Sequence, residues 1–148
     1  MDYPFFERGI LKLNRAIVLR FLISMLILVP AGIATKFYTG PCGIWIQFYF
    51  GGILYEIFWC ILFAFGFGRA SALRIAIGVF VVTGALECLQ LWHPPFLESI
   101  RSTFPGRALI GTSFSWLDFP HYILGCLLGF MWIHWIRRDS FLPLFKDR

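Results

Sequence analysis

The chain has 148 residues, of which 59% are hydrophobic and only 14% are charged, and its mean hydropathy is +0.75. A soluble domain of this length has too little interior to bury so many apolar side chains, so we predict a single all-α integral membrane domain over residues 1–148. The formal net charge of +5 comes from basic residues at the ends of apolar segments rather than on one face. That pattern is typical of topology signals, and we expect no nucleic-acid binding.

Four apolar segments are long enough to cross a bilayer core of roughly 30 Å as helices. They cover residues 16–34, 44–67, 72–91 and 116–136. Residues 1–15 mix apolar and charged side chains, and either a short interfacial helix or a frayed tail fits them. We therefore predict four transmembrane helices, with an amphipathic outer loop between the third and the fourth.

One acid, Glu56, lies near the middle of the second segment and far in sequence from any basic residue. Charged side chains are costly at that depth, so we expect it to face the other helices. It could be a neutral acid, an acid paired with another helix, or part of a proton or ion path, and the sequence leaves these readings open.

The third segment ends in a polar stripe, because Thr83, Glu87 and Gln90 recur at helical spacing. An ionised Glu87 facing lipid would cost about 2–3 kcal/mol, so it should face the bundle and find a partner. Arg101 and Arg107, in the following loop, are the natural counterions of Glu87 and of Asp118, which stands at the start of the fourth segment. Alternatively, one of these arginines is left to hold an anionic ligand.

The loop begins with Pro94–Pro95, which ends the third helix. The stretch "PPFLESIRSTF" has helical apolar spacing and predicts a short surface helix. We expect its apolar side chains to face the bilayer, namely Phe96, Leu97, Ile100 and Phe104.

At the start of the fourth segment, Ser115 and Asp118 stand three residues apart, as in a capping box. Because Pro120 fits only the first turn of a helix, Asp118 could itself be the N-cap residue. Tyr122 follows one turn later. Gly125 and Gly129 then form a GxxxG stripe, which predicts close packing against another helix.

Histidine and serine residues near this region do not form a catalytic or metal-binding pattern. His93 and His121 lack ligand-type spacing, so we expect no metal and no cofactor. Ser115, Asp118 and His121 are the residue types of a hydrolase triad, but the last two share one helix turn and no nucleophile elbow is present. We assign no catalytic residue and do not expect an enzyme, although an enzyme acting on a lipid-linked substrate stays an open alternative.

The distribution of lysine and arginine predicts the orientation in the membrane. Ten of the 13 basic residues fall on one predicted side. They are Arg8, Lys12, Arg15, Arg20, Arg69, Arg74, Arg137, Arg138, Lys146 and Arg148. The positive-inside rule then places both termini in the cytoplasm and the Glu87 region on the outer side, with Lys36, Arg101 and Arg107.

The combination of Glu87-x-x-Gln90, an arginine-bearing loop, "FSWLD" and Tyr122 resembles the VanZ-like superfamily. The segment "QLWHPPFLESIRSTFPGRALIGTSFSW" is similar to a subgroup of small bacterial inner-membrane proteins of unknown function, sometimes labelled as ribosome-maturation proteins. The resemblance implies a four-span protein of a bacterial cytoplasmic membrane. Its better-known VanZ branch is associated with low-level teicoplanin resistance. The subgroup usually has Gly-Asp where this chain has Gly51–Gly52.

From these patterns we predict a non-enzymatic membrane protein with an outward polar cleft for an anionic lipid or a cell-envelope precursor. The candidate ligand-binding residues are Glu87, Gln90, Arg101, Arg107, Ser115, Asp118 and Tyr122. Its expected partners are membrane lipids, and no protein partner is identified. In the structural alternative, the same groups tie helices together in a scaffold or assembly factor.

Overall fold

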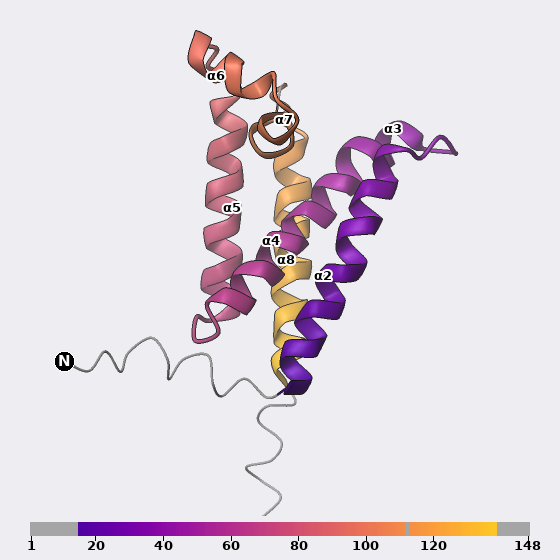
Figure 1. The fold of residues 1–148 in the computed structure, drawn as a ribbon, viewed down its shortest axis with the longest axis vertical. Helices are drawn as coiled ribbons and strands as arrows, with labels where there is room; N and C mark the ends of the chain where they lie inside the picture. The colour runs from indigo at the N-terminus through magenta and orange to yellow at the C-terminus, as the bar shows by residue number, and fades with distance from the viewer. Residues whose placement is uncertain (1–14, 112, 139–148) are drawn as a thin grey trace, which may run out of the picture.

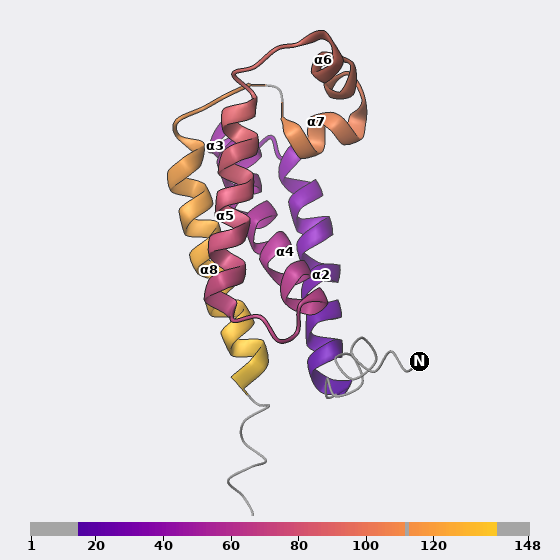
Figure 2. The same ribbon diagram turned by 90° about the vertical axis from the view of Figure 1, so that its left-hand side faces the viewer.

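The computed structural model describes residues 15–111 and 113–138, and in these ranges it contains helices and no strands. Four helical segments are long and apolar enough to cross a membrane. They are α2 (Arg15–Lys36), the segment Gly43–Gly66, α5 (Ala72–Leu89) and α8 (Asp118–Arg138), which form the bundle in Figures 1 and 2. The predicted all-α, multi-pass membrane architecture is confirmed. The interfacial helix considered for residues 1–15 lies almost wholly outside the described residues.

The second span is built from three consecutive helical pieces. These are α3 (Gly43–Trp45), the π-helical turn η1 (Ile46–Phe50) and α4 (Gly51–Gly66). The π-helical turn widens the start of this span, a feature that often marks functional regions of helices. Figure 1 shows α4 crossing obliquely, and it packs against α2, α5 and α8. Helix α4 is therefore the central helix of the bundle.

Glycine residues bring α8 into close contact with α4. A Cβ atom added to Gly125 would lie 2.6 Å from the Cβ of Glu56, and one added to Gly129 would lie 2.7 Å from the Cβ of Cys60. Only glycine leaves room for such an approach between two helix backbones. The predicted packing role of the GxxxG stripe is confirmed.

Apolar side chains divide between the bundle core and its outer surface. The core draws on all four spans and includes Phe21, Leu28, Ile57, Ile61, Val79, Ile133 and Ile136. Other large apolar side chains point outward, among them Leu26, Ile77, Val81, Ile123, Leu127 and Met131. Lipid tails solvate such a surface, whereas water would not.

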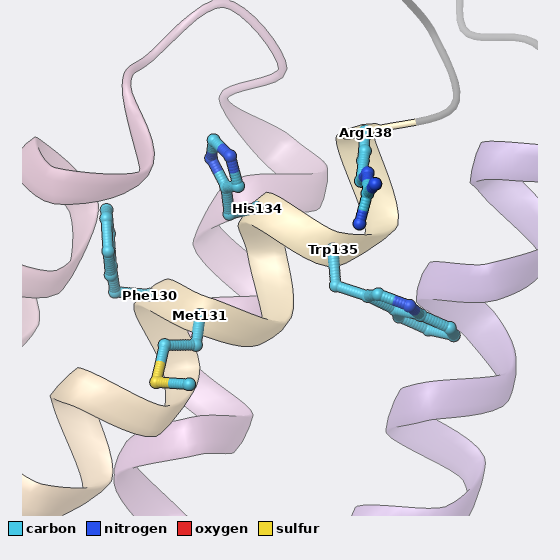
Figure 3. Close-up of a pocket in the computed structure, with 5 residues that line it drawn as sticks. All are labelled: Phe130, Met131, His134, Trp135 and Arg138. Atoms are coloured by element: carbon cyan, nitrogen blue, oxygen red, sulfur yellow. The ribbon is translucent and has the colours of Figure 1, made fainter. Parts of the chain in front are cut away.

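The outer surface of α8 carries a pocket of about 340 Å³ near the end of the helix. Its lining residues all come from this one helix and are Phe130, Met131, His134, Trp135 and Arg138. Figure 3 shows them fanning out from the helix, with Trp135 directed toward α2. The pocket is thus a depression on the outside of α8 rather than a cavity between the spans.

Polar contacts fix the end of the bundle where α2 begins and α8 ends, which we call the terminal end. The guanidinium of Arg137 donates to the carbonyls of Ala70 (2.6 Å) and Ala64 (2.9 Å) and so ties α8 to the end of α4. Deeper in the bundle, the indole N–H of Trp132 donates to Ser24 Oγ at 3.1 Å and ties α8 to α2.

Two short helices cover the opposite end, which we call the loop end. They are α6 (Pro95–Arg101) and α7 (Phe104–Ile110), and Figure 2 shows α6 above the long helices and α7 beside the upper end of α5. The short helix predicted in this stretch is confirmed as α6, although it ends at Arg101 and Phe104 already begins α7. The expectation that its apolar side chains all face outward was wrong for Leu97, which is buried within the protein, while Phe96 and Ile100 are exposed. The side chain of Phe104 is not among those described.

Candidate functional site

A buried carboxylate, Glu87, organises the loop end. It lies in the last turn of α5 and is 1% exposed. Its Oε1 accepts a hydrogen bond from the backbone N–H of Ser115 at 2.8 Å. Its Oε2 accepts from Gln90 Nε2 at 2.7 Å and from the Tyr122 hydroxyl at 2.9 Å. The carboxylate therefore joins α5, the loop after α7 and the first turns of α8. We call these four residues the Glu87 cluster.

The helical period of α5 explains why Glu87 faces inward. Thr83, Glu87 and Gln90 are all buried and share the face that packs toward α8. A carboxylate so close to lipid needs partners inside the bundle. The sequence predicted this direction correctly. The donors it finds are an amide, a phenol and a backbone N–H, none of which is an arginine.

Arg101, at the end of α6, is 4% exposed and closes the end of α5. Its guanidinium donates to the carbonyl oxygens of Leu89 (2.9 Å) and Trp92 (3.0 Å). It also forms a salt bridge with Glu98 at 2.6 Å. A cation at a helix C-terminus satisfies free carbonyls and complements the helix dipole.

The expected pairing of Arg101 with Glu87 or Asp118 was therefore wrong. Glu98 lies on the same short helix, three residues before Arg101, where side chains meet without any tertiary requirement. Glu98 was not among the predicted residues, although its spacing of three residues from Arg101 was the signal that could have identified it.

Arg107, on α7, is exposed and forms no salt bridge with the residues that the structure describes. Its helix ends at Gly111, whose φ of +76° favours glycine. A Cβ atom at Gly111 would lie 2.5 Å from Gln90 Nε2. The end of α7 is thus pressed against the Glu87 cluster, and Arg107 lies one turn away on a fixed support.

Asp118 is the first residue of α8, so it is neither the residue before the helix nor the third residue of a capping box. The Ser115 hydroxyl instead accepts a hydrogen bond from the N–H of Leu117 at 3.3 Å. An acid in the first turn still complements the helix dipole. Asp118 is half-buried, and Glu87, His121 and Lys36 are its electrostatic neighbours.

The residue types of a hydrolase triad are not arranged as one. His121 Nδ1 lies 2.6 Å from the carbonyl oxygen of Leu117, and its ring stacks on Tyr49 with centroids 4.5 Å apart. The hydroxyl of Ser115 makes its contact with Leu117 N–H rather than with this ring. Within the described residues, no group of three or more His, Cys, Asp or Glu side chains could hold a metal ion.

Glu56 lies deeper, on α4, and is fully buried. Cys126 Sγ donates to its Oε2 at 3.1 Å, while its Oε1 has no hydrogen-bond partner among the described residues. One turn nearer the loop end, a Cβ atom at Gly52 would lie 3.7 Å from the Tyr122 ring. A side chain at position 52 would therefore point at the Glu87 cluster, but here that position carries none.

A family profile described as "Protein of unknown function (DUF2809)" matches residues 43–126, more than half of the chain. The chain belongs to this family. No curated protein and no solved structure matches it.

The DUF2809 segment runs from α3 into the first half of α8. It therefore contains the whole Glu87 cluster, both arginines of the loop, and the contact between Glu56 and Cys126. Helix α2 and the second half of α8, which includes Arg137, lie outside the matched segment. Every candidate residue considered above falls within the part of the chain that defines the family.

Proposed function

We propose that this DUF2809 protein binds the phosphate of an anionic lipid or of a lipid-linked cell-envelope precursor at its loop end, without catalysing a reaction. The observation that carries the proposal is Arg107. This guanidinium is exposed, forms no salt bridge with the described residues, and lies on a helix whose end is pressed against Gln90. An exposed guanidinium without a salt bridge to the described residues is well suited to bidentate binding of phosphate.

The two loop arginines have different roles in this proposal. Arg101 serves the fold, since its bonds to Leu89, Trp92 and Glu98 leave it 4% exposed. Arg107 serves the ligand. The Glu87 cluster holds the support on which Arg107 is placed, and Asp118 borders it. Of the predicted candidates, we therefore assign direct contact with the headgroup to Arg107 alone.

We further propose that the protein resides in a bacterial cytoplasmic membrane with the loop end outside. Helix α2 begins with Arg15 and α8 ends with Arg138, and Figure 1 shows the beginning of α2 and the end of α8 at the same end of the bundle. That end also carries Arg69, in the connection between α4 and α5, and Arg74, in the first turn of α5. The excess of basic residues there supports a cytoplasmic terminal end.

A relation to the VanZ-like superfamily belongs to the same proposal. It is supported by Glu87-x-x-Gln90, the loop arginines, and the serine–aspartate start of α8. A role in the cell envelope, including tolerance of a glycopeptide such as teicoplanin, would follow. Deleting the gene and measuring teicoplanin susceptibility tests this part. Unchanged susceptibility on both deletion and overexpression would remove the resistance role.

The experiment that tests headgroup binding compares two exposed arginines at opposite ends of the bundle. Arg107→Gln and the control Arg69→Gln remove the same charge. Thermal melting in detergent, with added phosphatidylglycerol or phosphatidylcholine, is measured for the parent and both variants. We expect phosphatidylglycerol to raise the Tm of the parent and of Arg69→Gln, and to shift Arg107→Gln no more than phosphatidylcholine does. Equal shifts in all three proteins would refute the ligand site at Arg107.

One observation favours a second candidate function, that of a structural scaffold. Every oxygen of Glu87 is used within the protein, so the cluster itself has no carboxylate oxygen free for a ligand. If the protein is a scaffold, a protein partner would bind the loop end. A stoichiometric protein that co-purifies with the parent and is lost in a variant without residues 95–110 would favour the scaffold.

A further inference from the structure

Glu56 is a titratable group that the proposed lipid site does not use. It is 0% exposed on the central helix, and its Oε1 has no hydrogen-bond partner among the described residues. Its titratable neighbours are Cys126 and Tyr122 on α8 and Tyr55 on its own helix.

Among the residues that the structure describes, no basic side chain offsets a charge at this position. On α5, the hydroxyl of Thr83 donates to the carbonyl oxygens of Val79 and Phe80 on its own helix, and the side chains that α2 buries are uncharged. A carboxylate with no counterion is strongly disfavoured in the interior of a membrane bundle, whereas a neutral carboxylic acid is tolerated. The surroundings of Glu56 therefore suit an acid that carries a proton.

Polar groups lead from the loop end down to this acid. On α8, Tyr122 and Cys126 are one turn apart, and they donate to Glu87 (2.9 Å) and to Glu56 (3.1 Å). On α5, Glu87 and Thr83 are likewise one turn apart and occupy the same two depths. Asp118, one turn above Tyr122, is half-buried at the start of α8. Three acids therefore lie at successive depths in the bundle. Asp118 is partly exposed at the loop end, Glu87 is buried below it, and Glu56 is buried deepest.

We propose that Glu56 is a proton-binding site in the middle of the bundle, and that it exchanges its proton with the loop end through Tyr122 and Glu87. The Tyr122 hydroxyl donates to Glu87 at 2.9 Å, and it lies one helical turn from Cys126, which donates to Glu56 at 3.1 Å. Tyr122 and Glu87 are therefore the polar side chains between the buried acid and the loop end. Glu56 itself takes no part in the lipid site at Arg107, whereas Tyr122 and Glu87 also belong to the cluster that supports Arg107.

Infrared spectroscopy of the full chain in detergent tests whether Glu56 holds a proton. We expect the parent at pH 7 to show the C=O stretch of a buried neutral carboxylic acid, and Glu56→Gln to lack that band. Identical spectra in the carboxylic acid region would mean that Glu56 is ionised, and the proposal would fail.

Transfer from H₂O to D₂O tests the route, because deuteration shifts the same band. We expect Tyr122→Phe to slow this shift at least tenfold. Tyr55→Phe, which alters a phenol beside Glu56 on the same helix, should exchange at the parent rate. Should Tyr122→Phe lose its helical circular dichroism, Glu87→Gln provides the same test, with the same tenfold slowing expected. Exchange at the parent rate in a folded variant, or equal slowing in Tyr55→Phe, would overturn the route through Tyr122.

Discussion

Glu87 shows what a single buried charge requires at the edge of a membrane bundle. Its two oxygens accept three hydrogen bonds from three separate segments of the chain. A hydrogen bond to a charged group contributes about 1.5–3 kcal/mol, and an unsatisfied partner costs more than the bond itself yields. The residues around Glu87 therefore matter for stability even where they make no contact with a ligand.

Tyr122→Phe removes one donor from Glu87 and leaves the ring in place. We expect the free energy of unfolding to fall by about 1–3 kcal/mol, because the carboxylate is too buried to recruit water easily. Chemical denaturation in detergent measures the change. The control is Tyr38→Phe, at an exposed tyrosine of the same end. An equal loss in both variants would show that the bond to Glu87 contributes little.

Sequence reasoning succeeded for Glu87 and failed for Arg101 for one physical reason. The direction of Glu87 follows from helical periodicity and the cost of facing lipid, which are both local properties. The partner of Arg101 depends on where the loop folds. Glu87 and Asp118 were the predicted partners, but the acid nearest in sequence, Glu98, forms the salt bridge. Leu97 was misplaced similarly, since a helix of seven residues does not reveal which face meets protein.

Among the helices, the contact between α4 and α8 depends most on residue size. Gly125 lies opposite both Glu56 and the carbonyl oxygen of Ile53. A Cβ atom added to Gly125 would lie 2.9 Å from that carbonyl oxygen. This contact was predictable, because GxxxG has a defined packing consequence. Its partner helix was not predictable, because α2, α4 and α5 are similarly apolar.

Gly125→Ala should lower the free energy of unfolding by about 1–3 kcal/mol, because the added methyl group overpacks the contact between α4 and α8. Gly78→Ala is the matched control. Nothing lies within 4 Å of a Cβ at Gly78, so alanine should be neutral or stabilise α5 by up to about 1 kcal/mol. Melting temperatures in one detergent compare the two. If Gly125→Ala melts no lower than Gly78→Ala, the close approach of α8 to α4 is refuted.

Helices α6 and α7 depend on Arg101 in a way that hydrogen exchange can measure. Arg101→Gln removes the donors to Leu89 and Trp92, so we expect amide exchange across residues 89–103 to accelerate about tenfold or more. Arg107→Gln, which alters an exposed side chain of α7, should leave exchange in these residues at the parent rate. Equal protection in both variants would contradict a closing role for Arg101.

For the whole molecule, the exposed cysteine at the loop end offers a test of orientation. Cys42 is exposed in the connection between α2 and α3. In a Cys88→Ser background, a membrane-impermeant maleimide should label Cys42 in intact spheroplasts. In a Cys42→Ser, Cys88→Ser background, Arg69→Cys should be labelled only after permeabilisation. The reverse pattern would place the loop end in the cytoplasm and would exclude binding of an outer-leaflet lipid there.

The bond between Cys126 and Glu56 joins residues 70 positions apart, and this separation bears on how the protein is made. Helix α4 leaves the ribosome well before α8 exists, with an acid in the middle of its apolar sequence. Until α8 arrives, Glu56 lacks Cys126 and the close cover of Gly125. We therefore expect the second span to reach its final packing only after the fourth span has been synthesised, so that helix α8 completes the assembly of this bundle.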